Sequence, residues 1–147
     1  MNAFDTLIDR LKHIEESLII TLSDVINDNS EQLEDAQREQ MSIGKNALNK
    51  NIGRLKNQGY AKAKKSSGGK APLNVADLKN KGDFYKGIKA SANDTTFTIT
   101  STDFKKPFLI KRYTDDIFGY NQKTFTKVKD LVLVPGMITD IKKQLGV

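Results

Sequence analysis

Few residues of this 147-residue chain have the types and spacing that catalysis requires. His13 is the only histidine, and it lies beside an apolar helical stripe with no carboxylate placed to orient it as a general base. The neighbouring acids Asp115 and Asp116 are typical of a solvated turn, because Ca²⁺ binding needs several more converging oxygen ligands. Cysteine is absent, which excludes disulfides, thiolate metal ligands and cysteine nucleophiles. We therefore expect no enzyme activity, no cofactor and no metal site.

The segment SSGGKA, residues 66–71, places two glycines before a lysine, as phosphate-binding loops do. It lacks the first glycine of the motif G-x-x-x-x-G-K-[ST], and no predicted strand precedes it. Ala71 stands where a Ser or Thr hydroxyl binds magnesium. We therefore reject a nucleotide-binding loop.

Basic residues are concentrated in 45–89, which holds twelve Lys and Arg against two Asp, a net charge of +10. This charge suffices for contacts to DNA phosphates. Nearly all of these residues are lysines, which read base edges poorly, so any DNA contact is expected to be non-specific. A solvated lysine loop without a partner explains the pattern equally well. The candidates for contact with DNA or a protein partner are Lys62, Lys64, Lys65 and Lys70.

The charge is divided between two parts of the chain. Residues 1–40 hold three bases and ten acids, a net charge of −7, and the remainder carries +13. Two surfaces of opposite sign favour different partners. The alternative is an acidic helix that folds back on its own basic body.

Apolar residues recur at steps of three and four from Phe4 to Ile26, which predicts an amphipathic helix. A break at 27–30, where Ser30 suits a cap, divides it from a second helical pattern. About 35 helical residues span about 50 Å, more than this small body covers, so part of the stripe is expected to meet another chain. The candidate inter-subunit face consists of Leu11, Leu18, Leu22 and Val25.

The rest of the chain predicts a single α+β domain with a small antiparallel sheet. Residues 95–102 and 108–113 have strand patterns, and 126–134 is either a third strand or the lead into a last helix. Pro135 suits the first turn of a short helix ending near Leu145. The predicted parts are an acidic helical segment at 1–39, a basic glycine-containing loop region at 40–80, flexible at 62–70, and a β-rich core with the C-terminal helix at 81–147.

The sequence predicts neither a secretory signal nor a membrane span. The first residues mix acids and bases as a secretory signal does not. The longest apolar runs fall far short of the about 20 residues that a membrane span needs. We expect a protein with no membrane contact.

The stretch KNKGDFYKGIKA, residues 79–90, joins the basic region to the predicted sheet. Gly82 and Gly87 suit backbone joints at which the chain turns. Phe84 and Ile88 are the expected core anchors, whereas Tyr85 is expected at the boundary with a solvated hydroxyl. A short helical turn is predicted just before this stretch, at 74–78.

The second half resembles the tail-completion and neck proteins of tailed bacteriophages. Leu78, Gly82 and Phe84, followed by Ile88, look like the family's Leu-x-x-(Thr/Ser)-Gly-x-(Leu/Phe) motif, which begins a strand. The lysine-rich stretch before it and Pro135 fall where the family has a basic segment and its final helix. The resemblance covers residues 40–147, and Lys81 replaces the usual small hydroxyl residue.

This resemblance implies a non-enzymatic structural subunit at the head-to-tail interface of the virion. It implies a homo-oligomeric ring, with portal, neck or tail-tube proteins as partners. The basic loop is a candidate for non-specific contact with packaged DNA. The expected location is the virion, and the host cytoplasm during assembly. Two alternatives remain: a non-specific DNA-binding accessory protein that uses the lysine-rich loop, and an interaction protein whose N-terminal helix forms a coiled coil.

Overall fold

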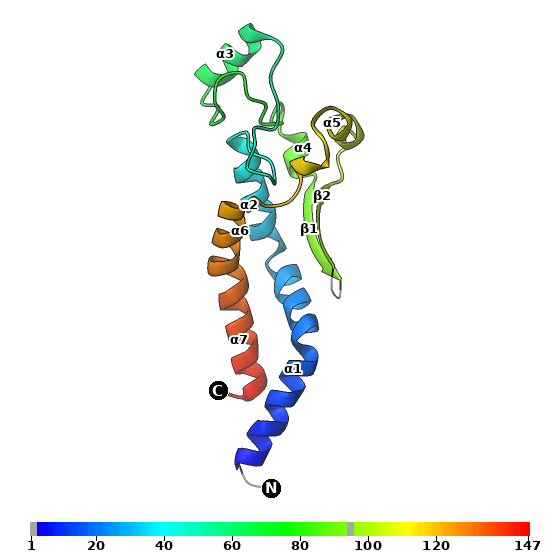
Figure 1. Cartoon of the computed structure of the whole chain (residues 1–147), viewed down its shortest axis with the longest axis vertical. Helices are drawn as coiled ribbons and strands as arrows, with labels where there is room; N and C mark the ends of the chain where they lie inside the picture. The colour runs from blue at the N-terminus through cyan, green and yellow to red at the C-terminus, as the bar shows by residue number, and fades with distance from the viewer. Residues whose placement is uncertain (1–2, 94–95) are drawn as a thin grey trace.

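Two consecutive helices form the axis of the elongated molecule in the computed structural model, which describes residues 3–93 and 96–147 (Figure 1). Helix α1 spans Ala3–Asp28 and α2 spans Ser30–Ser42. The predicted break between them is confirmed, because Asn29 leaves the helical conformation and its Nδ2 donates to the Val25 carbonyl at 2.8 Å. The N-cap position is Asn29, so the cap predicted at Ser30 was placed one residue too late.

The C-terminal helix is 24 residues long, and the prediction of a short helix is wrong. Asn121 caps its start by accepting a hydrogen bond from the Thr124 amide at 3.0 Å. The third-strand alternative for 126–134 is therefore wrong, and the alternative of a lead into the last helix is confirmed. The helix consists of α6 at Gln122–Val128, a π-helical turn η2 at Lys129–Leu133, and α7 at Val134–Leu145.

Pro135 lies inside this long helix and does not mark its beginning. A proline lacks the amide that would bond the carbonyl four residues earlier, and its ring crowds the preceding turn. The π-helical turn η2 stands directly before it and widens the backbone there. This local widening accommodates Pro135 without ending the helix.

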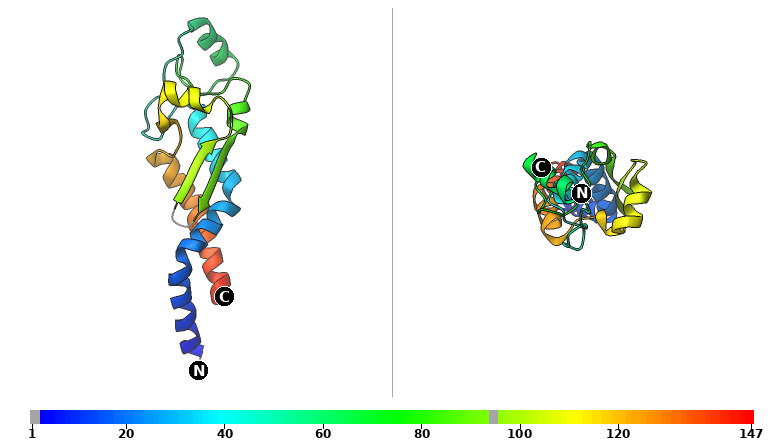
Figure 2. Two further views of the ribbon diagram at one scale, coloured as in Figure 1. Left: turned by 90° about the vertical axis from the view of Figure 1, so that its right-hand side faces the viewer. Right: turned by 90° about the horizontal axis from the view of Figure 1, so that it is seen from above.

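Helix α7 packs along the second half of α1, and the start of α1 and the end of α7 point toward the same end of the molecule (Figures 1 and 2). The two helices approach closely at Gly136, where a Cβ atom would lie 2.6 Å from Val25 Cγ1. Further along, Gln144 Nε2 donates to Thr21 Oγ1 at 3.1 Å. The acidic N-terminal helix therefore covers part of its surface with its own C-terminal helix.

A two-stranded antiparallel hairpin lies against the α1–α2 junction. Strand β1 spans Ile88–Asn93 and β2 spans Thr96–Ser101, which confirms the strand predicted at 95–102. The sequence also predicts a turn at Asn93 and Asp94 before this strand, and Asp94 and Thr95 lie outside the described residues. Asn27 satisfies the edge of β1, because its side chain donates to the Ala92 carbonyl at 3.0 Å and accepts from the Ala92 amide at 2.9 Å.

The strand predicted at 108–113 is wrong, since these residues belong to helix α5, Lys106–Tyr113. Pro107 stands in its first turn, and the Asp103 carboxylate accepts a hydrogen bond from the Lys105 amide at 2.7 Å. A short apolar run does not by itself distinguish a strand from a helix. A 3-10 turn, η1 at Asp115–Ile117, follows α5.

Residues 43–82 are mostly irregular, with one helix, α3 at Gln58–Ser66. Asn57 caps α3 by accepting from the Tyr60 amide at 2.9 Å. The loop predicted at 62–70 is therefore helical over 62–66. The helical turn predicted at 74–78 is also wrong, because Val75 pairs with Arg54 in an isolated antiparallel bridge.

The glycines of the KNKGDFYKGIKA stretch do act at backbone turns. Gly82 has a left-handed backbone at φ +91° and precedes the one-turn helix α4, Asp83–Lys86. Gly87 has an ordinary φ, but a Cβ atom there would lie 2.8 Å from Ser101 Oγ. Gly87 is therefore required for the close approach of the strand pair.

The aromatic pair of this stretch is buried. Phe84 is 4% exposed and Ile88 is fully buried, which confirms both as core residues. The prediction of a solvated Tyr85 hydroxyl is wrong, because this side chain is 8% exposed and its hydroxyl donates to the Asp77 carbonyl. Burial, reinforced by the Asp77 carboxylate, raises the pKa of Tyr85.

The core forms two clusters that meet along β1. The first lies around the C-terminal end of α2, and the second lies between α1, α2, β1 and α6. Successive inward residues of β1, Ile88 and Ala90, belong to one cluster each. The first cluster contains Met41, Ile52, Ala76, Phe84, Tyr85, Ile88 and Ile117, and the second contains Ile26, Leu33, Ala90 and Val128.

Candidate assembly surface

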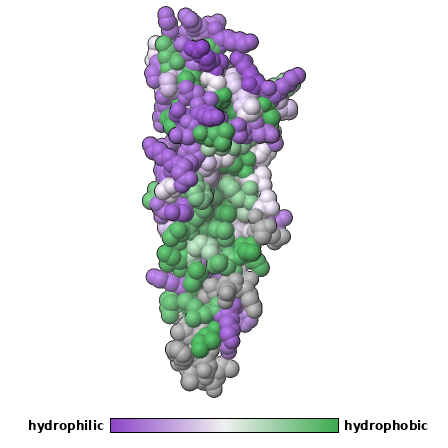
Figure 3. All heavy atoms as spheres, in the orientation of Figure 1, coloured by the Kyte–Doolittle hydropathy of each residue, from purple (hydrophilic) through white to green (hydrophobic). Residues whose placement is uncertain are grey.

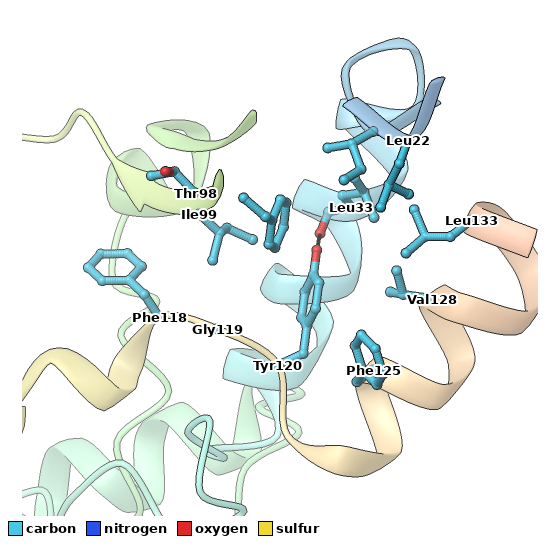
Figure 4. Close-up of a pocket in the computed structure, with 12 residues that line it drawn as sticks. Leu22, Leu33, Thr98, Ile99, Phe118, Gly119, Tyr120, Phe125, Val128 and Leu133 are labelled. Carbon is cyan, nitrogen blue, oxygen red and sulfur yellow. Dashed lines mark hydrogen bonds between the residues drawn. The ribbon is translucent and has the colours of Figure 1, made fainter. Parts of the chain in front are cut away.

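An open apolar trough of about 610 Å³ lies between the hairpin and the helices (Figure 4). Its floor comes from the α1–α2 junction, its walls come from β2 and from α6–η2, and the linker before α6 closes one end. We call this surface the apolar trough: Leu22, Ile26 and Leu33 in the floor, Phe97, Thr98 and Ile99 in one wall, Phe125, Val128 and Leu133 in the other, and residues 118–120 at the end.

The hairpin wall is fixed by aromatic packing. Phe97 and Ile99 occupy alternate positions of β2, and the Phe97 ring stacks on Tyr120 with 6.0 Å between centroids. The Tyr120 hydroxyl donates to the Leu33 carbonyl at 2.7 Å (Figure 4). Burial, and secondarily the charge of Glu34, raises the pKa of Tyr120, so this hydroxyl stays protonated and donates inward.

The helical wall depends on a buried glutamine of α2. Gln40 Nε2 donates to the Gly119 carbonyl at 2.9 Å, and its Oε1 accepts from the Asn121 amide at 2.8 Å. These two bonds hold the linker against α2 and set the start of α6. Phe125 and Val128, three residues apart on α6, consequently share the face that lines the trough.

Exposed apolar residues of α1 lie beyond the trough, and Figure 3 shows a green area over the middle of the molecule. Leu22, Leu18 and Leu11 are 39%, 44% and 48% exposed. Val25, the fourth residue of the predicted inter-subunit face, is instead buried against Gly136 of α7. The side chains of three other stripe residues lie outside the described part of the structure: Phe4, Leu7 and Ile14.

The four candidate lysines have different environments. Lys64 pairs with the nearly buried Asp77 carboxylate. Lys65 Nζ donates to the carbonyls of Gly69 and Ala71, each at 3.1 Å. Lys62 and Lys70 have exposed side chains. Two of the four lysines therefore stabilise the loop after α3, and two remain open to a partner.

A second hollow of about 300 Å³ lies between α3, α4 and α5, and we call it the basic cleft. Its cations come mainly from segments outside 62–70, and Asp83 offsets part of their charge at 3.9 Å from Lys105 Nζ. The sequence did not predict the basic cleft, because the residues of α5 have a strand pattern. The charged and aromatic residues of the basic cleft are Tyr60, Lys64, Lys79, Lys81, Asp83, Phe84, Lys105, Arg112 and Tyr113.

The described residues provide no metal cluster. No three His, Asp or Glu side chains converge within 3–93 and 96–147. His13 lies on the exposed side of α1. Thr114 Oγ1 donates to Asp116 Oδ2 at 3.1 Å, as in a capped turn. Over the same residues, no helix has the length and apolarity needed to cross a membrane.

No protein-family model matches the chain, and neither a curated protein nor a solved structure shows significant similarity to it.

Sequence reasoning missed the aromatic residues that give these surfaces their character. Phe97 and Phe125 of the trough are 41% and 45% exposed, and Phe104 and Phe108 beside α5 are 76% and 70% exposed. The alternation of Phe97 with Ile99 was a usable signal for one apolar strand face. The outward position of Phe108 depends on the helical conformation of 106–113, which the strand pattern did not predict.

Proposed function

We propose that this chain is a structural subunit of a tailed-phage virion at the head-to-tail interface, where it forms an oligomeric ring that joins the portal or neck to the tail. The observation that carries the proposal is the apolar trough with its continuation along α1. Soluble monomers rarely leave such a continuous apolar surface open, because each Å² removed from water is worth about 25 cal/mol. An obligate assembly partner explains why it persists.

The shape and charge of the subunit support the same proposal. The molecule is long and narrow, so its sides offer more contact area than its ends (Figures 1 and 2). Residues 1–40 carry a net charge of −7 and residues 45–89 carry +10, so one copy can attract another side by side. Contacts between different surfaces of identical subunits generate closed rings when the rotation closes.

Electron microscopy of the purified protein and mass spectrometry of purified virions test this function. We expect ring-shaped particles of uniform diameter, and peptides of this chain in intact virions after DNase and washing. A protein absent from washed virions contradicts the proposed role even if the purified chain self-assembles.

A second candidate function, non-specific DNA binding, is favoured by the exposure of Lys62 and Lys70. Replacing both with Gln should weaken DNA retention and reduce its salt dependence by roughly two counterions. Lys65→Gln is the matched control, because its ammonium is bonded to backbone carbonyls. Equal retention of the double variant and the unmodified protein at low salt contradicts this candidate.

A further inference from the structure

Helix α5 presents an unusual outer face. Its inner face, formed by Leu109, Ile110 and Tyr113, packs against the first core cluster. Phe104, two residues before the helix, and Phe108 are 76% and 70% exposed. Phe104 lies in the turn that leads into α5 and Phe108 lies in the first turn of the helix, and neither ring packs against that core. We call this pair the aromatic knob.

The two rings of the aromatic knob cannot be buried by their own chain. The core contacts of α5 fix the rotation of the helix, so turning the two rings inward would expose the inner face. Figure 1 shows α5 on the opposite side of the body from α6 and α7, and the view from above in Figure 2 also shows them apart. A surface that buries both rings must belong to another molecule.

The apolar trough has the size and chemistry to receive the knob. Its volume of about 610 Å³ is open in the described structure, and aromatic and aliphatic side chains line it. Sites of this size, about 300–1,000 Å³, bury ligands much larger than one aromatic ring. Aromatic rings that fill a preformed apolar pocket are the residues that most often dominate the energy of a protein interface.

Charge complementarity identifies the source of the knob as a second copy of this chain. Around Phe104 and Phe108, residues 103–113 hold four bases and one acid, a net charge of +3. The trough floor lies within residues 22–33, which hold three acids and no base, a net charge of −3, whereas the α6–η2 wall at 122–133 carries +2. Pairing two α1 stripes with each other would bring acidic segments together, whereas pairing α5 with α1 brings opposite charges together.

We infer that Phe104 and Phe108 of one subunit insert into the apolar trough of its neighbour, so that each copy gives a knob and receives one. The inference rests on the proposed ring-forming function and names the two surfaces that build the ring. This contact is heterologous, since the knob and the trough are different surfaces of the same chain. It leaves no knob and no trough unfilled once a ring has closed.

Three variants and their mixture test the inference by sedimentation velocity over a range of concentrations. The knob variant is Phe104→Ser with Phe108→Ser, the trough variant is Phe97→Ser with Phe125→Ser, and the control is Leu73→Ser. Leu73 is 48% exposed and lies outside both surfaces, so its loss matches the change in surface hydrophobicity. Circular dichroism verifies folding, and Leu22→Ser replaces the trough variant if the latter unfolds.

We expect the unmodified protein and Leu73→Ser to assemble, with the knob and trough variants sedimenting as monomers. Loss of one hot-spot ring weakens association by about thirtyfold or more. A mixture of the two variants should give one-to-one dimers and nothing larger, because the knob variant keeps its trough and the trough variant keeps its knob.

Two results overturn the inference and leave the proposed function standing if virions contain the chain. One is assembly of the knob variant at the same concentration as the unmodified protein, which places the subunit contact elsewhere. The other is a mixture that remains monomeric, which means that the knob binds a different surface. An unmodified protein that stays monomeric throughout the concentration range also overturns it, and would leave another virion protein as the occupant of the trough.

Discussion

The contact between Gly136 and Val25 predicts an alanine substitution with an unusual sign. In a helix interior, Gly→Ala normally stabilises by about 1 kcal/mol. At Gly136 the added Cβ would lie 2.6 Å from Val25 Cγ1, and Val25 is 6% exposed with little room to move. Overpacking of this kind costs about 1–3 kcal/mol. We therefore expect Gly136→Ala to lower the free energy of unfolding by up to about 2 kcal/mol.

Shortening the partner side chain should reverse that sign. Val25→Ala alone removes two methyl groups and is expected to cost about 1.5 kcal/mol or somewhat more. In that background the steric conflict is gone, so Gly136→Ala should stabilise by about 1 kcal/mol. Urea unfolding followed by circular dichroism measures all four proteins of the cycle. The same effect of Gly136→Ala in both backgrounds would refute the packing of α7 against α1.

Three further predictions concern the core and the loop after α3. Phe84→Ala should lower the free energy of unfolding by about 3–5 kcal/mol, because this ring is buried. Phe108→Ala, at an exposed ring, should change it by less than about 0.5 kcal/mol. Similar losses of stability for the two variants in urea titrations would contradict the assigned burial. Lys64→Met should lower the free energy of unfolding by about 1–3 kcal/mol, because it leaves the nearly buried Asp77 carboxylate without its partner. Lys62→Met should leave the stability nearly unchanged. A lower unfolding midpoint for Lys62→Met than for Lys64→Met would refute the pairing of Lys64 with Asp77. The raised pKa of Tyr85 means that its stabilising contribution is complete below about pH 10 and is lost as the pH rises further. Tyrosinate absorbance should therefore show that Tyr85 ionises only as the protein unfolds at alkaline pH. Ionisation of Tyr85 in the folded protein near the usual tyrosine pKa of 10.0 would contradict its burial.

The N-terminal helices and strand β2 were predictable because local periodicity decides them. The three- and four-residue spacing of α1 and the alternation in β2 are each complete within one segment. The break at Asn29 also follows from local chemistry, since several polar residues there compete with helical hydrogen bonds.

The C-terminal half was less predictable because its two helix-associated prolines, Pro107 and Pro135, occupy different positions in their helices. Pro107 stands at the start of α5, as the usual rule has it, but the apolar run after it resembled a strand. Pro135 was expected to start a helix, and a π-helical turn instead lets the helix continue through it. No single-residue propensity encodes such a compensation between neighbours.

The candidate site was predictable only in part, since it is assembled from distant segments. Leu11, Leu18 and Leu22 were identified from their spacing alone, and the structure leaves them exposed. The walls of the trough could not be predicted, because only tertiary packing brings Phe97 of β2 and Phe125 of α6 to the same hollow. Likewise, the structural use of Lys64 depends on Asp77, thirteen residues away.

The central claim is that the apolar trough is the contact surface between subunits. A density map of the assembled particle tests it most directly. The account predicts a closed ring in which aromatic side chains from the adjacent copy fill the trough beside Phe97 and Phe125. A ring whose troughs face solvent, with the subunits joined through other surfaces, would contradict it.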